Sequence, residues 1–126
     1  MSLLILVVDD EPDVEVLFRQ QFRRELRAGR FAMEFAQSAP MALQRITNAG
    51  DESLILILSD INMPGMSGLD LLQYLKKSGC TIPVIIITGK PSIRPEAFYL
   101  ESGAAGFFRK PVDGDALLEL IGSVCT

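Results

Sequence analysis

Five short apolar runs punctuate the chain, and each predicts a strand. They are Leu3–Val8, Phe31–Ala36, Leu54–Leu58 (continued by Ser59 and Asp60), Pro83–Thr88 and Gly106–Lys110. Uninterrupted apolar runs of this length are typical of strands buried on both faces. Phe31–Ala36 instead alternates large apolar residues with smaller or polar ones, which favours a half-exposed strand at a sheet edge. The pattern therefore predicts a mostly buried sheet.

Between these runs, apolar residues recur at helical spacing. The predicted helices are Pro12–Arg27, Ser38 to about Gly50, Ser67–Ser78, Glu96–Ser102 and a last helix that begins at Asp113. Serine and aspartate at such starts cap the first turn of a helix. Ser67 followed by Asp70 also has the spacing of a capping box. Each predicted strand is thus followed by a helix.

This alternation, a strand and then a helix five times over, predicts the α/β class. The expected architecture is a (βα)5 doubly wound parallel five-stranded sheet, with right-handed crossovers and helices on both faces. A chain of 126 residues is long enough for one such domain, and we expect residues 1–126 to form it.

Polar residues stand where four of the apolar runs end. They are Asp9 and Asp10 after the first run, Asp60 after the third, Thr88 at the end of the fourth and Lys110 at the end of the fifth. In a parallel sheet the carboxyl ends of all strands lie along one edge, which is where open α/β folds bind ligands. We therefore expect these five side chains to gather in one region.

Such a group of side chains has the parts needed for phosphoryl transfer. Crowded carboxylates repel one another unless a cation joins them, and Mg²⁺ typically takes one or two carboxylates together with phosphate oxygens. A lysine and a threonine hydroxyl can bind further phosphoryl oxygens. The chain contains no histidine. The acceptor is therefore predicted to be a carboxylate, forming an aspartyl phosphate.

The amino-acid composition limits the binding partners and the cellular location that we expect. The net charge of -4 argues against direct binding of nucleic acid, because lysine and arginine carry phosphate contacts. The two cysteines have no paired spacing, and no stretch has the length of a signal peptide or a membrane span. We expect a cytoplasmic protein without disulfides and without a membrane partner.

Four segments together resemble the receiver domain of two-component response regulators, the CheY-like superfamily. They are Asp9-Asp10, Asp60–Gly68, Thr88-Gly89 and Gly103–Pro111. The resemblance spans nearly the whole chain. It implies the flavodoxin-like strand order 2-1-3-4-5 and a regulatory phosphoacceptor domain, not an enzyme, that assists its own phosphorylation and dephosphorylation.

The same resemblance implies a role for each acidic residue of the region. Asp60 is the phosphoacceptor. Asp10 binds Mg²⁺ directly, Asp9 binds it through water, and Asp60 and the backbone carbonyl of Asn62 are the other protein ligands. Mn²⁺ can substitute for Mg²⁺.

The remaining roles implied by the resemblance concern phosphate binding and signalling. Lys110 is the phosphate-binding ammonium, and the Lys110–Pro111 peptide bond is cis. Thr88 is the switch hydroxyl. Phe107, three residues before the lysine, is the aromatic switch.

Partners are implied in the same way. A histidine kinase or a histidine phosphotransfer protein is expected to dock near the first helix through Val14 and Leu17. An output domain or a second copy of the chain is expected on the face formed by Glu96–Ser102, Gly106–Lys110 and the last helix. The side chains predicted to be available on that face are Tyr99, Glu101, Arg109 and Glu119.

Two other readings stay open at this stage. A Mg²⁺-dependent aspartyl-phosphate hydrolase uses similar groups, but such enzymes carry an Asp-x-Asp pattern after the first strand, where this chain has adjacent acids. A degenerate receiver would serve only as an interaction module. Taken alone, Asp9, Asp10, Glu11 and Asp13 could simply be acids that favour a helix N-terminus.

Overall fold

The computed structural model describes residues 3–48, 53–89 and 94–125, and within them it has five strands. The strands are β1 (Leu3–Val8), β2 (Ala32–Ala36), β3 (Ser53–Asp60), β4 (Val84–Thr88) and β5 (Gly106–Arg109). The helices are α1 (Asp13–Gln21), α2 (Arg23–Arg27), α3 (Ala39–Thr47), α4 (Gly68–Lys77), α5 (Glu96–Glu101) and α6 (Gly114–Cys125).

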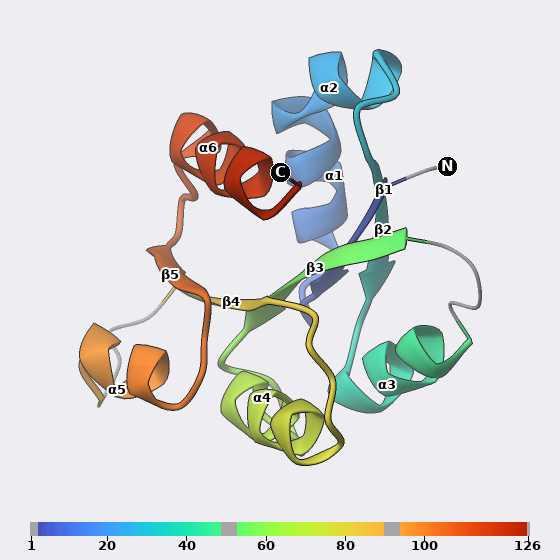
Figure 1. Ribbon diagram of the computed structural model, residues 1–126. Helices are drawn as coiled ribbons and strands as arrows, with labels where there is room; N and C mark the ends of the chain where they lie inside the picture. The colour runs from blue at the N-terminus through green and yellow to red at the C-terminus, as the bar shows by residue number, and fades with distance from the viewer. Residues whose placement is uncertain (1–2, 49–52, 90–93, 126) are drawn as a thin grey trace.

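The strands form one parallel sheet in the order β2-β1-β3-β4-β5. Helices α1, α2 and α6 cover one face, and α3, α4 and α5 cover the other (Figure 1). Both the predicted α/β class and the implied strand order are confirmed. β2 lies at one edge of the sheet, as its alternating pattern predicted.

Side chains of successive strand residues enter two different apolar layers. Leu6 and Val8 of β1 pack in the layer with α3, α4 and α5, whereas Ile5 and Val7 pack in the layer with α1 and α6. Burying one such side chain is worth about 1.5–3 kcal/mol. Because both faces of the sheet are filled in this way, polar side chains find room mainly at the ends of the strands.

The predicted helix Pro12–Arg27 is not continuous. It divides into α1 and α2 at Phe22, whose backbone angles of φ -108° and ψ 24° leave the α-helical region. The Phe22 side chain is fully buried, stacked on Phe18 and in edge contact with Phe31. We attribute the break to this packing, because the helical spacing of apolar residues continues through it.

The predicted helix starts are confirmed. Ser38 accepts a hydrogen bond from the Met41 N–H at the start of α3. Ser67 and Asp70 form the predicted capping box of α4. The Asp113 carboxylate accepts the Asp115 and Ala116 N–H groups at the start of α6.

Gly50, the predicted stop of the second helix, lies outside the described residues. No helix in the described ranges is long and apolar enough to cross a membrane.

Candidate functional site

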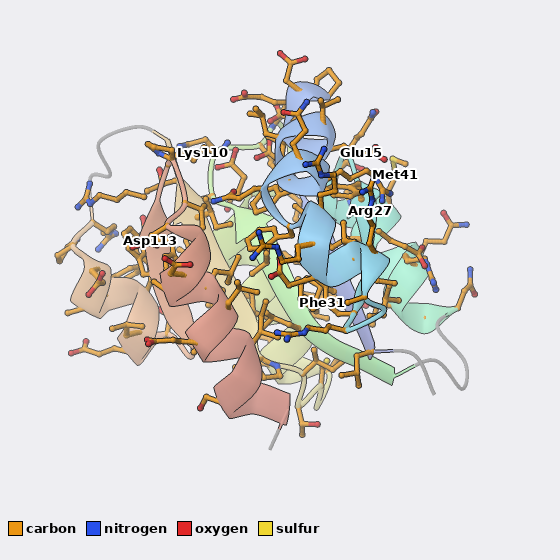
Figure 2. The ribbon with its side chains drawn as sticks, turned by 90° about the horizontal axis from the view of Figure 1, so that it is seen from above. Glu15, Arg27, Phe31, Met41, Lys110 and Asp113 are labelled. Atoms are coloured by element: carbon orange, nitrogen blue, oxygen red, sulfur yellow. The ribbon has the colours of Figure 1, made fainter. Side chains whose placement is uncertain are left out.

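Four of the predicted side chains are delivered by the carboxyl ends of four strands. Asp60 is the last residue of β3 and Thr88 the last of β4, while Asp9 and Lys110 directly follow β1 and β5. Asp9, Asp60 and Thr88 are buried, and the Lys110 side chain is 24% exposed. Figure 2 shows Lys110 at the end of the molecule where α1 begins.

The Lys110 ammonium joins the acids. Its Nζ donates to Asp9 Oδ2 at 2.8 Å and to Asp60 Oδ2 at 3.4 Å, and it lies 3.9 Å from Glu11 Oε1. Asp9 is therefore its closest partner. Among the residues that the structure describes here, one cation faces three carboxylates, so their negative charge is in excess.

Asp9, Glu11 and Asp60 bring one carboxylate oxygen each to within 4.8 Å of the others. Glu11 was predicted only as an acid near a helix N-terminus. Its own N–H donates to Asp9 Oδ1 at 2.9 Å, a turn that brings both side chains to the site. The only signal for it in the sequence was its position two residues after Asp9.

Asp10 points differently from Asp9. Its side chain is exposed, and it lines a cavity of about 210 Å³ together with Asp60, Asn62 and Lys110. The predicted direct ligand and the predicted phosphoacceptor thus line the same small cavity.

Asn62 fixes two neighbouring groups. Its N–H donates to Asp60 Oδ1 at 3.1 Å, which orients the carboxylate. Its side-chain amide donates to Thr88 Oγ1 at 3.3 Å, a contact that the sequence did not predict. Asp60 and Thr88 are therefore linked through a single residue of the loop after β3.

The donor set suits a hard divalent cation. The cavity is lined by carboxylates from two strand ends and by Asn62 of the following loop. Oxygen donors of this kind are the ones that Mg²⁺ prefers, and its charge would offset the excess of acids. This acidic pocket therefore suits a divalent cation such as Mg²⁺.

Burial raises the pKa of Asp60. The Asn62 N–H opposes this effect, the charge of Asp9 adds to it, and Lys110 lowers the pKa in turn, but the net shift is upward. Burial alone lowers the pKa of Lys110. The hydrogen bond to Asp9 and the charges of Asp60, Asp9 and Glu11 outweigh that effect, so the pKa of Lys110 is raised.

This imbalance predicts that Asp60→Asn stabilises the metal-free protein at pH 7. A raised folded pKa means that the contribution of Asp60 to stability is present below its unfolded pKa of about 3.9 and is lost as pH rises through the folded value. An asparagine does not ionise, so the variant does not lose this stability as pH rises. Lys110 keeps its closer partner Asp9. Asn62 can still donate to the amide oxygen of the variant.

Thermal unfolding in chelator from pH 4 to pH 8 measures the effect. The variant should melt higher at pH 7, by a margin that shrinks toward pH 4. In a domain of this size each kcal/mol corresponds to about 3–5 °C in Tm. A lower Tm for the variant at pH 7 would mean that the attraction between Asp60 and Lys110 outweighs the crowding of acids.

The other predicted residues lie around this site. The Lys110–Pro111 peptide bond is cis, as predicted. Val14 and Leu17 line a groove beside Lys110, but Val14 is only 6% exposed whereas Leu17 is 61% exposed. Of the two predicted docking residues, Leu17 is thus the one accessible to a partner.

Tyr99 was predicted to be available for pairing, and that prediction is wrong. Its side chain is 4% exposed and stacks on Phe107, with ring centroids 5.5 Å apart. Stacking on Phe107, which lies three residues before Lys110, buries the Tyr99 side chain. Glu101, Arg109 and Glu119 are exposed as predicted.

Comparison with known proteins gives a consistent result. A family model described as the response regulator receiver domain matches residues 5–122. The response regulator MprA of Mycobacterium sp. (strain KMS) is 31% identical over 118 residues, which make up 94% of this chain and 48% of that protein. The chain therefore spans about half the length of the curated relatives it matches.

Solved structures agree with this match. A CheY-like response regulator receiver domain protein from Methanospirillum hungatei JF-1 has a TM-score of 0.80 at 32% identity, covering 98% of this chain and 93% of that one. The receiver domain of NtrX from Brucella abortus has a TM-score of 0.78 at 31% identity, covering 95% and 96%.

Proposed function

The chain belongs to the receiver domains of response regulators, the regulatory domains of two-component signalling, and from that premise we propose that it accepts a phosphoryl group on Asp60. The observation that carries this proposal is the position of Asp60. Its carboxylate is buried, oriented by the Asn62 N–H and within 3.4 Å of the Lys110 ammonium. The test is uptake of one phosphoryl group from acetyl phosphate, measured by intact mass with and without Mg²⁺.

The transfer itself needs little from the protein beyond positioning and charge. An oxygen of Asp60 attacks phosphorus in line, a new O–P bond forms, and the bond from phosphorus to the donor nitrogen or oxygen breaks with its electron pair leaving on the donor. Lys110 moves from Asp60 onto a phosphoryl oxygen and keeps its contact with Asp9, its closer partner. The Thr88 hydroxyl donates to another phosphoryl oxygen.

We propose Asp10, Asp60 and the Asn62 carbonyl as direct ligands of Mg²⁺ or Mn²⁺, with Asp9 acting through water. The metal supplies charge neutralisation at the phosphoryl oxygens. Glu11, brought to the site by its turn, adds a further acid at the rim of the metal site.

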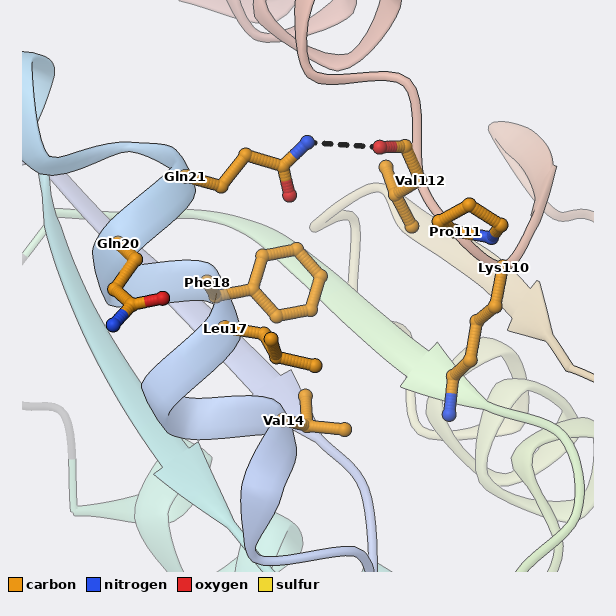
Figure 3. A pocket seen from close by; sticks show the side chains of 8 residues that line it. All are labelled: Val14, Leu17, Phe18, Gln20, Gln21, Lys110, Pro111 and Val112. Atoms are coloured by element: carbon orange, nitrogen blue, oxygen red, sulfur yellow. Dashed lines mark hydrogen bonds between the residues drawn. The ribbon is translucent and has the colours of Figure 1, made fainter.

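A phosphohistidine donor has to approach Asp60 across the rim of the site. Figure 3 shows a groove between α1 and residues 110–112, with the Lys110 ammonium at one end. The groove has a volume of about 660 Å³ and is lined by Val14, Leu17, Phe18, Gln20, Gln21, Lys110, Pro111 and Val112. We propose that a histidine kinase or phosphotransfer protein docks here, with Leu17 as its main apolar contact.

This proposal predicts that Leu17→Asp slows transfer from a phosphohistidine protein about tenfold or more, because truncating a central apolar contact of an interface costs about 1–2 kcal/mol or more. Labelling by acetyl phosphate should not change. Val16→Asp is the matched control, since Val16 is 56% exposed on the same helix and does not line the groove. Equal slowing in both assays, or by both variants, would contradict docking through the groove.

Phosphorylation is proposed to act on the face made by α5, β5 and α6. Thr88 follows the phosphoryl group and Phe107 turns inward, which is a population shift driven by contacts that exist only in the modified state. A cavity of about 380 Å³ between β5 and α6, lined by Phe107, Phe108 and Leu120 among others, supports this face as the site for an output domain or a second chain.

The coupling predicts that beryllofluoride, a phosphoryl mimic, shifts the NMR signals of both Phe107 and Tyr99 in wild type. Thr88→Ala should still bind the mimic but lose most of that shift, because the connection runs through the hydroxyl. Thr81→Ala, at an exposed position away from the site, is the control. Shifts confined to the loop after β3 in wild type would contradict the coupling.

A further inference from the structure

One side chain ties the loop that carries Lys110 to the opposite wall of the groove. Gln21 is the last residue of α1, and its Nε2 donates to the Val112 carbonyl at 2.8 Å. The two residues are separated by 91 positions in the chain. Figure 3 shows this bond spanning one end of the groove, opposite the Lys110 ammonium.

In the described residues, this loop has few other hydrogen bonds to the rest of the domain. The Lys110 N–H donates to the Thr88 carbonyl at 2.9 Å, which ends the sheet. Pro111 has no N–H to donate. In the described part of the chain, the Gln21 amide is the only group found to hydrogen-bond to Pro111 or Val112. Val112 also packs against the apolar layer of α1 and α6, so the segment that follows Lys110 is held by this packing together with the Gln21 hydrogen bond.

Gly114, the first residue of α6, leaves the space that the Gln21 amide occupies. A Cβ at residue 114 would lie 2.9 Å from Gln21 Nε2, closer than such atoms approach. The contact thus depends on two residues from distant parts of the sequence. Neither of them touches the carboxylates of the site.

We infer that Gln21 is a positioning residue for phosphoryl transfer, which holds the Lys110 ammonium over Asp60 by tethering Val112 to α1. The inference rests on the proposed function, since it concerns the group that receives the phosphoryl oxygens. The Lys110 ammonium contacts both Asp9 and Asp60, so a shift of the segment that carries Lys110 changes its distance from both carboxylates. Small displacements of a positioned group reduce transfer disproportionately.

Gln21→Glu tests the tether with almost no change of shape. A carboxylate cannot donate to the Val112 carbonyl. Gln20→Glu makes the same change of charge one residue earlier, at a side chain that lines the same groove. The readouts are the affinity for Mg²⁺ alone and the affinity for beryllofluoride at saturating Mg²⁺, both measured by calorimetry on the chain as it stands.

We expect Gln21→Glu to weaken beryllofluoride binding about three- to tenfold, the effect of losing one hydrogen bond, and to leave Mg²⁺ affinity within about twofold because the carboxylates are untouched. Gln20→Glu should change neither. Gly114→Ala should displace the Gln21 amide and likewise weaken beryllofluoride binding while leaving Mg²⁺ affinity unchanged, without a change of charge. This variant tests the tether if Gln21→Glu does not fold.

The outcomes separate the two proposals. If wild type with Mg²⁺ does not bind beryllofluoride, the proposed function fails. If wild type binds it and Gln21→Glu and Gly114→Ala both behave like Gln20→Glu, the proposed function stands and the tether is wrong. Parallel loss of Mg²⁺ and beryllofluoride affinity would assign Gln21 a merely structural role, and that too overturns the inference.

Discussion

Asp60→Asn is expected to take up no phosphoryl group under conditions in which the wild-type protein gains one. The amide is a poor nucleophile, while the rest of the site is preserved, since Asn62 and Lys110 keep partners in the variant. Intact-mass measurement after incubation with acetyl phosphate and Mg²⁺ gives the answer. Removing Mg²⁺ with a chelator should abolish uptake by the wild type as well.

Asp70→Asn is the matched control. It makes the same chemical change in an exposed carboxylate of the α4 capping box, so uptake should continue. A phosphorylated Asp60→Asn protein would refute the assignment of the acceptor. Steady release of phosphate from small phosphoesters by the wild type would instead favour the aspartyl-phosphate hydrolase reading.

Gly68→Ala is expected to destabilise the fold and disturb the site together. Gly68 is the first residue of α4 and is buried, and a Cβ there would clash with the Asp60 carbonyl oxygen and lie 2.9 Å from Ile61 Cα. Both are backbone atoms, which cannot move aside as a flexible side chain would. Forcing extra volume into such a contact costs about 1–3 kcal/mol. Thermal or denaturant unfolding measures this cost.

The same substitution should slow phosphoryl uptake, because relief of the clash moves the start of α4 and the backbone of Asp60 and Ile61 apart. Gly122→Ala is the control, since nothing lies within 4 Å of a Cβ at that exposed position of α6. It should stabilise the helix by up to about 1 kcal/mol. A Gly68→Ala protein as stable as Gly122→Ala would show that this close approach is unimportant.

The fold followed from the sequence because each level of the pattern agreed. Uninterrupted apolar runs, helix caps and the strand–helix alternation all indicated one parallel sheet. Asp9, Asp60, Thr88 and Lys110 could be grouped without coordinates, since a parallel topology places the carboxyl ends of its strands at one edge. The grouping needed only the ends of the runs.

The predictions that were wrong concern features that depend on tertiary contacts. The break at Phe22 arises from the packing of that ring against Phe18 and Phe31, while the local pattern continues as a helix. The spacing of apolar residues in the short helix α5 does not determine whether Tyr99 is exposed. Its ring is buried because it stacks on Phe107. The spacing of residues along a single helix predicts neither the packing of Phe22 nor the stacking of Tyr99.

The position of Glu11 and the hydrogen bond from Gln21 were not predicted, for a related reason. Glu11 joins it through a turn made by its own N–H and Asp9, and the tether from Gln21 joins residues 91 positions apart. The first is a matter of local backbone geometry and the second of two elements packing side by side. A single sequence shows which groups are available but not which of them meet.

Chemical mapping of the phosphorylated residue tests the central claim most directly. Borohydride reduces an aspartyl phosphate to homoserine, which peptide mass spectrometry can locate. After treatment of wild type with acetyl phosphate and Mg²⁺, we expect homoserine at residue 60 and at no other aspartate. Homoserine at Asp9 or Asp10, or phosphate that survives reduction on a hydroxyl side chain, would contradict the assignment of Asp60 as the phosphoacceptor.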